Sequence, residues 1–152
     1  MPNISKITKK RLGEILVNEG LITNEQMQEG LSEQQKSGGM LGENLIKLGY
    51  ITEMDIAAAL STQFGLPYID ATHCTITKEV LDIIPMELMN QYQFVILDKI
   101  GSVVTIAISL PIGQKVIEEI EKKTSCQVFA FVSTSSQIKQ AIQSAQGQTK
   151  KK

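Results

Sequence analysis

The chain contains 152 residues, of which 42% are hydrophobic and 20% are charged, and its formal net charge is −1. This composition is that of a globular protein of one domain or two small packed subdomains, and it excludes a collagen-like chain. The near balance of charge gives no support to bulk electrostatic binding of DNA, RNA or an anionic membrane. No apolar run approaches the roughly 20 residues of a membrane span, and the first residues lack the apolar segment of a signal peptide.

The first half of the chain contains a direct repeat. Residues 11–34 and residues 40–63 are two 24-residue units separated by a five-residue spacer, which makes the period 29 residues. Such self-similarity at a fixed period indicates two copies of one supersecondary unit. Ten positions are identical in the two units: Leu12/Leu41, Gly13/Gly42, Glu14/Glu43, Leu16/Leu45, Gly20/Gly49, Ile22/Ile51, Thr23/Thr52, Leu31/Leu60, Ser32/Ser61 and Gln34/Gln63.

Each unit has the pattern of a helix, a turn and a second helix. In the first unit, apolar residues at helical spacing begin at Leu12, and Gly20 has the position of a C-terminal helix cap. Thr23 and Gln26 then form the pattern of a capping box at the start of the next helix. The second unit repeats these signals, so residues 8–64 are predicted to form about four short helices in a tandem-repeat subdomain.

Three features of the repeat go beyond what helix packing requires. Gly13 and Gly42 lie near helix starts, where glycine costs about 1 kcal/mol relative to alanine, so we expect a close approach to the backbone. Gln34 and Gln63 recur at the ends of the units and are candidates for a paired hydrogen bond. The basic cluster Lys9–Arg11 precedes a helix whose first amides can bind an anion. The alternatives are close helix packing, simple capping and a solvated charge run.

The second half of the chain predicts a small α+β subdomain over residues 65–145. The order is helix, helix, strand, strand, helix, strand, helix, with a three-stranded sheet. Thr77 is expected to cap the first helix, and Ser133 or Ser135 to cap the last. The predicted elements between these caps are 78–84, 85–92, 94–98, 103–109, 113–123 and 126–132, with a hairpin turn at 99–102. Residues 146–152 have no apolar anchor and are predicted to be a disordered tail.

The cysteines and the single histidine argue against catalysis. Cys74 and Cys126 form no CxxC pair and are typical of a reduced, cytoplasmic protein in which they serve as small buried hydrophobes. His73 and Cys74 cannot supply the usual ligands of a zinc site, and neighbours in an extended segment point to opposite sides. No Walker loop, GxGxxG or HExxH motif is present. We therefore expect a protein that is not an enzyme.

The doubled pattern RLGxxLxxxG…LxxQ, with its five-residue spacer and the following segment FGLPYID, resembles the MshEN-type domain over residues 9 to about 145. This domain occurs at the N-terminus of type II secretion and type IV pilus assembly ATPases. Its ligand is cyclic di-GMP, which has two phosphates and two guanines and is held by two tandem 24-residue motifs. The resemblance therefore implies a cytoplasmic receptor that binds cyclic di-GMP and relays the signal to an attached or separate assembly ATPase or an inner-membrane platform protein.

The resemblance also implies which residues contact the ligand. Arg11 would pair with a guanine edge or stack on its face, the leucines would contact bases and riboses, and the glutamines would hydrogen-bond to the ligand or lock the motif. The implied ligand contacts are Lys9, Arg11, Leu12, Gly13, Leu16, Gln34, Met40, Leu41, Gly42, Leu45 and Gln63.

Two positions depart from the family pattern. Met40 stands where the first motif has Arg11, and Leu110 stands where family members often carry an aspartate. These departures favour an alternative function, a protein–protein docking module of the same fold that binds no nucleotide. The intact Leu-Gly pairs and the paired glutamines favour ligand binding.

Overall fold

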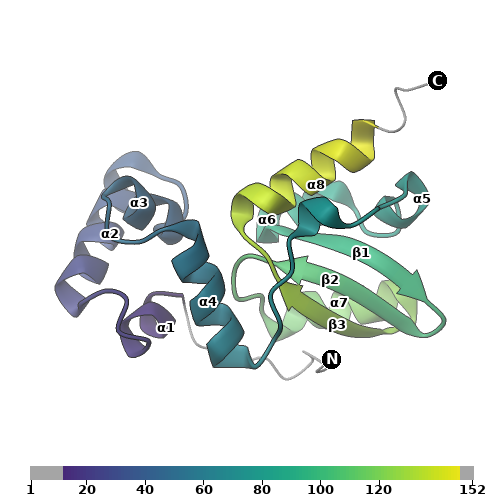
Figure 1. Ribbon diagram of the computed structural model, residues 1–152, viewed down its shortest axis with the longest axis horizontal. Coiled ribbons are helices and arrows are strands. Elements are labelled where there is room, and N and C mark those ends of the chain that lie inside the picture. Colours follow the sequence, from purple (N-terminus) through teal and green to yellow (C-terminus); the bar gives the residue numbers. More distant parts are fainter. Residues whose placement is uncertain (1–11, 148–152) are drawn as a thin grey trace.

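The computed structural model describes residues 12–147 of the chain (Figure 1). This part contains eight α-helices, a short 3-10 helix and three strands. The elements are α1 (Leu12–Asn18), α2 (Asn24–Ser37), α3 (Leu41–Lys47), α4 (Glu53–Phe64), η1 (Ala71–His73), α5 (Lys78–Leu81), α6 (Met86–Tyr92), β1 (Phe94–Ile100), β2 (Val103–Ile108), α7 (Gln114–Thr124), β3 (Gln127–Val132) and α8 (Ser135–Gly147).

The repeat of the sequence is a repeat of the structure. Helices α1 and α2 recur as α3 and α4, and each later helix begins 29 residues after its counterpart. Both predicted capping boxes are confirmed, because the hydroxyls of Thr23 and Thr52 accept hydrogen bonds from backbone N–H groups three residues later, each at 3.1 Å. Gly20 and Gly49 have positive φ angles of 75° and 83°, which glycine adopts without strain.

The two units pack on each other through their glycines. A methyl group placed at Gly13 would lie 3.2 Å from Leu41 Cδ2, and one placed at Gly42 would lie 3.2 Å from Leu12 Cδ2. Each motif therefore presents its leucine to the glycine of the other motif. The close approach expected at these glycines comes from the protein's own side chains, so the packing alternative accounts for the repeated glycine.

The second half of the chain forms the predicted three-stranded sheet, in the order β1-β2-β3. Strands β1 and β2 form an antiparallel hairpin in which Phe94 pairs with Ile108, and β3 runs parallel to β2 with Val103 opposite Gln127. Helix α8 packs on β1 and β2, and α7 packs on β3 (Figure 1). The predicted α+β fold class, with four repeat helices packed on this sheet-containing half, is confirmed.

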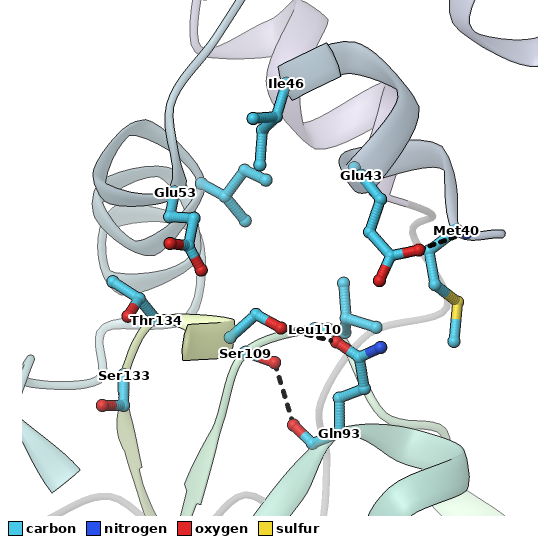
Figure 2. Close-up of a pocket in the computed structure, with 12 residues that line it drawn as sticks. Met40, Glu43, Ile46, Glu53, Gln93, Ser109, Leu110, Ser133 and Thr134 are labelled. Carbon is cyan, nitrogen blue, oxygen red and sulfur yellow. Dashed lines mark hydrogen bonds between the residues drawn. The ribbon is translucent and has the colours of Figure 1, made fainter. Parts of the chain in front are cut away.

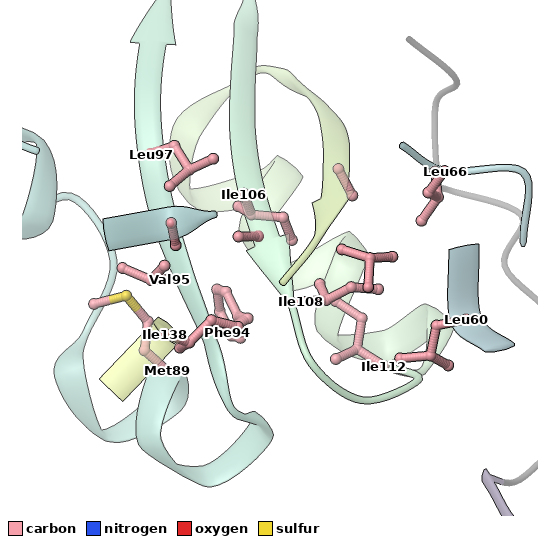
Figure 3. Close-up of a cluster of buried hydrophobic side chains, with 14 of the residues drawn as sticks. Leu60, Leu66, Met89, Phe94, Val95, Leu97, Ile106, Ile108, Ile112 and Ile138 are labelled. Atoms are coloured by element: carbon pink, nitrogen blue, oxygen red, sulfur yellow. The ribbon is translucent and has the colours of Figure 1, made fainter. Parts of the chain in front are cut away.

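One continuous hydrophobic core joins the two halves. Leu60 of α4 and Leu66 lie next to Ile108 and Ile112 from the end of β2 and the loop that follows it (Figure 3). All four side chains are at most 2% exposed. Because α4 contributes to this core, the repeat helices are held in a defined position against the sheet. We call this contact, between α3–α4 and the half formed by residues 65–147, the seam.

The last helix begins differently from the prediction, which placed its cap at Ser133 or Ser135. Thr134 is the cap, since its hydroxyl accepts a hydrogen bond from Gln137 N at 3.1 Å and its own N–H donates to Gln137 Oε1 at 3.0 Å. The Ser133 hydroxyl donates to the same Gln137 oxygen and accepts from Ala71 N. Ser133 therefore ties α8 to the η1 segment instead of capping the helix.

Helix α8 ends at Gly147, two residues into the predicted disordered tail, and residues 148–152 lie outside the described part of the chain. No helix between residues 12 and 147 combines the length and the hydropathy that crossing a membrane requires.

Replacing Leu60 by alanine tests whether the seam is part of the folding core. We expect Leu60→Ala to lower the free energy of unfolding by about 2–5 kcal/mol, because it leaves a cavity in the shared core. Met54→Ala, at a position that is 51% exposed on the same helix, should change it by no more than about 0.5 kcal/mol. Urea denaturation of both variants makes the comparison. Equal effects would show that α4 does not share the core of the sheet.

Candidate functional site

A first depression lies on the repeat helices α1, α2 and α3. It has a volume of about 320 Å³ and is lined by Gly13, Glu14, Met27, Leu31 and Leu41. Most of this lining is apolar, and the glycine leaves the helix backbone accessible beside the two leucines. A depression of this size and character is at the lower end of the range of small-molecule sites, which begins at about 300 Å³.

A second depression lies at the seam, where α3 and α4 meet the end of β2 and the start of α8 (Figure 2). Its volume is only about 30 Å³, which is room for about two water molecules. One wall comes from the repeat helices and the other from the sheet-containing half. The lining residues are Met40, Gly42, Glu43, Ile46, Glu53 and Ile56 on the first wall, and Gln93, Ser109, Leu110, Ser133, Thr134 and Ser135 on the second.

The two depressions are related by the repeat. Three residues of the first depression have their counterparts, 29 residues later, in the second depression. The pairs are Gly13/Gly42, Glu14/Glu43 and Met27/Ile56. The protein therefore presents the same surface of its repeat unit twice, once open and once closed against the other half of the chain.

Four of the residues that the sequence predicts as ligand contacts line these depressions. Gly13 and Leu41 lie in the first depression, and Met40 and Gly42 lie in the second. Leu110, the other departure from the family pattern, faces the same small cavity as Met40. The two departures, which are 70 residues apart in the sequence, thus fall in one place in the fold.

Three predicted leucine contacts lie beneath the surface. Leu16 and Leu45 have no exposed side-chain area, and Leu12 is 9% exposed. All three belong to the hydrophobic core. Any influence of these leucines on a ligand is exerted by holding the helices that carry the lining residues.

The remaining predicted contacts lie in neither depression. Gln34 donates a hydrogen bond from Nε2 to the carbonyl oxygen of Gly39 at 3.0 Å, so it closes the spacer between the two motifs. Gln63 is half-buried near the end of α4. Lys9 and Arg11 lie outside the described residues, immediately before α1.

Two glutamates give the second depression an acidic lining. Glu43 accepts a hydrogen bond from Met40 N at 3.0 Å, and its other oxygen lies 4.0 Å from Lys139 Nζ. Glu53 accepts two hydrogen bonds from Ser136 of α8, at 2.8 Å from the backbone N–H and 2.7 Å from the hydroxyl. The anion-binding amides at the starts of α3 and α8 are thus already satisfied by the protein's own carboxylates.

Gln93 is held in an unusual backbone conformation beside this depression. It ends α6 with φ 55° and ψ 56°, a left-handed conformation that costs a non-glycine residue about 1 kcal/mol or more. Its carbonyl oxygen accepts hydrogen bonds from the backbone N–H and the hydroxyl of Ser109, at 3.3 Å and 2.9 Å. Its side-chain Oε1 accepts one from the Ser135 hydroxyl at 3.1 Å. These contacts direct the Gln93 amide into the cavity (Figure 2).

The sequence predictions missed several lining residues. Glu14 and Glu43 were visible as an identical pair of the repeat, but a glutamate at the third position of a helix is already explained by capping. Glu53 and Gln93 carry no local signal, because they meet only when the sheet packs against α4. Met27 has the helical spacing of a core residue, which hides its place at the edge of the first depression.

The cysteine and histidine at the start of the second half have no catalytic arrangement. Burial, and secondarily the charge of Asp70, raise the pKa of the Cys74 thiol, which makes the thiolate scarcer. His73 points its Nε2 toward Asp70 at 3.6 Å. Within residues 12–147, no three His, Cys, Asp or Glu side chains gather in a way that could hold a metal ion.

Comparison with known proteins identifies relatives for nearly the whole chain. The model of the MshEN domain family matches residues 64–152. The type IV pilus assembly ATPase PilB of Myxococcus xanthus is 29% identical over 133 residues, which cover 88% of this chain and 24% of that protein. PilB of Thermus thermophilus is 30% identical over 142 residues, which cover 92% of this chain and 16% of that protein. The chain thus spans about a quarter or less of the length of these relatives.

Two solved structures share the fold. A structure of MshE with cyclic di-GMP superposes with a TM-score of 0.68 at 24% identity, covering 90% of this chain and 99% of that one. The N-terminal domain of XpsE superposes with a TM-score of 0.67 at 22% identity, covering 88% of this chain and 92% of that one. Both superpositions extend over the repeat helices as well as the sheet-containing half.

The contact between Glu53 and Ser136 should stabilise the seam. We expect Glu53→Ala to lower the free energy of unfolding by about 1 kcal/mol, because it leaves a first-turn amide of α8 without its acceptor. Ser136→Ala should cost less, since the backbone N–H remains bonded to Glu53. Urea denaturation of both variants distinguishes the two contributions. A larger loss in Ser136→Ala would contradict the assignment of Glu53 as the acceptor that completes α8.

Proposed function

Since the chain belongs to the MshEN domain family, we propose that it is a receptor domain that binds one molecule of cyclic di-GMP across its two depressions. The observation that carries this proposal is the pairing of the depressions by the 29-residue repeat. Cyclic di-GMP consists of two identical halves, and a surface that presents the same motif twice is suited to such a ligand. The presence of cyclic di-GMP in the MshE structure of the same fold supports the choice of ligand.

The first depression suits a planar base. Met27, Leu31 and Leu41 offer apolar contact to the faces of a ring, and Gly13 leaves room beside the helix backbone. Lys9 and Arg11 precede α1 in the sequence, so they supply cationic groups for the phosphates or for a guanine face.

The second depression provides a route for a signal. It is formed jointly by the repeat helices and the sheet-containing half, so a ligand that enters it must change the packing at the seam. We propose that an assembly ATPase, attached or separate, or an inner-membrane platform protein detects this change on the cytoplasmic side. The pilus assembly ATPases among the relatives support a partner of this class.

A docking module that binds no nucleotide is the second candidate. The small volume of the second depression, about 30 Å³, favours it, because a base cannot enter without displacement of a wall. In that case the exposed apolar side chains of the repeat helices would contact a partner directly. Leu31, Leu48 and Met54 are the exposed large apolar residues of these helices within the described part of the chain.

Two leucines of equal exposure provide a matched test of cyclic di-GMP binding. Leu31 and Leu48 are both 36% exposed, but only Leu31 lines a depression. We expect Leu31→Glu to weaken cyclic di-GMP binding about 10-fold or more, because it places a carboxylate against an anionic ligand, while Leu48→Glu leaves the affinity within about 2-fold. Isothermal titration calorimetry measures both, with GTP as the ligand control and Arg11→Ala as a third variant expected to weaken binding.

The stoichiometry decides between the two candidates. Saturation at one cyclic di-GMP per chain, weakened by Leu31→Glu and by Arg11→Ala, is the result expected of the receptor. An absence of heat at about 100 μM ligand would contradict the receptor function and leave the docking module as the better account.

A further inference from the structure

We propose that the second depression recognises the hydrogen-bonding edge of one guanine, through the carboxylate of Glu43 and the side-chain amide of Gln93. This inference rests on the proposed function and names the residues that would make the site specific for guanine. It assigns the second depression to a base and leaves the phosphates to the cationic groups elsewhere on the repeat.

The charge of the second depression favours a base over a phosphate. Glu43 and Glu53 line it, and a phosphate placed between two carboxylates would be repelled by both. Guanine, in contrast, presents two adjacent donors, N1–H and the N2 amino group, on its Watson–Crick edge. A carboxylate accepts two such hydrogen bonds side by side, whereas adenine presents an acceptor at N1.

Glu43 has unused acceptor capacity and Glu53 does not face the cavity in the same way. Both Glu53 oxygens are engaged by Ser136. Glu43 accepts one hydrogen bond, from Met40 N, and its second oxygen is 4.0 Å from the Lys139 ammonium, outside hydrogen-bond distance. Its side chain is 47% exposed, so a ligand can reach it.

Gln93 supplies the complementary donor. Its Oε1 is engaged by the Ser135 hydroxyl, which leaves Nε2 as the part of the amide that is available to an acceptor. Figure 2 shows the Gln93 amide on the Met40 side of the cavity, below the Glu43 carboxylate. Guanine O6 is the acceptor next to N1–H, so Glu43 and Gln93 together match the donor, donor, acceptor order of the guanine edge.

A base can enter only if part of the lining moves. Met40 is half-buried at the rim, and its unbranched side chain adapts more easily than a branched one. A displaced Met40 would contact the face of the base, while Glu43 and Gln93 contact the edge. The first depression contains the counterpart Glu14, but among the described residues it has no second wall that carries an amide. The two halves of the ligand are therefore recognised with different stringency.

Glu43→Gln tests this inference without removing the helix cap. Glutamine closes the same capping box in α2, where Gln26 accepts from Thr23 N at 2.9 Å, so the melting temperature should stay that of the unmodified chain. Cyclic di-IMP is the probe, because hypoxanthine retains N1–H and O6 but lacks the N2 amino group. Glu119→Gln, at an exposed position on α7, is the matched control.

We expect the unmodified chain to prefer cyclic di-GMP over cyclic di-IMP by about 10-fold or more, since an unpaired acceptor in the site penalises the ligand without the amino group. Glu43→Gln should reduce that preference to about 3-fold or less, mainly by weakening cyclic di-GMP, and Glu119→Gln should preserve it. If the unmodified chain binds cyclic di-GMP and Glu43→Gln keeps the full preference, the inference is wrong and the proposed receptor stands. If the unmodified chain binds neither dinucleotide, both are overturned.

Discussion

The structure depends on the reciprocal contact between the two motifs, in which each leucine packs against the glycine of the other unit. Leu12 lies against Gly42 and Leu41 lies against Gly13, at distances that leave no room for a larger residue without displacement. This contact brings the starts of α1 and α3 together and gives the repeat unit its compact shape. It also explains why the glycines recur, since a β-carbon at either position would force the other motif outward. The two depressions exist because this packing exposes the same edge of each unit.

The sheet-containing half makes the two depressions unequal. It leaves the first open at about 320 Å³ and covers the second, which shrinks to about 30 Å³. The cover is held by the apolar core around Leu60 and by the hydrogen bonds of Glu53 to the first turn of α8. A symmetric ligand would therefore meet one half-site that is ready to bind and one that must be opened. That asymmetry gives binding a mechanical consequence, because opening the second half-site changes the seam and with it the orientation of the repeat helices.

Local signals in the sequence predicted the repeat, the capping boxes at Thr23 and Thr52, and the order of elements in the second half, because caps, turns and helical periodicity depend on residues a few positions apart. The same signals could not separate ligand contacts from core residues. Leu16 and Leu45 have helical spacing whether they face a ligand or the interior, and the structure buries both completely. The second depression was beyond local patterns, since Gln93 reaches α3 only through packing of the sheet. Its left-handed conformation has no sequence marker of the kind that a glycine provides.

Methionine methyl groups test the central claim, that one cyclic di-GMP occupies both depressions, most directly. Met27 lies in the first depression and Met40 in the second, whereas Met54 is exposed outside both and Met89 is buried in the core. In an NMR titration of the chain carrying ¹³C-labelled methionine methyls, the signals of Met27 and Met40 should shift together and saturate at one ligand per chain, with Met54 and Met89 unchanged. Shifts confined to Met27, with Met40 unaffected at saturation, would contradict a ligand that spans the repeat.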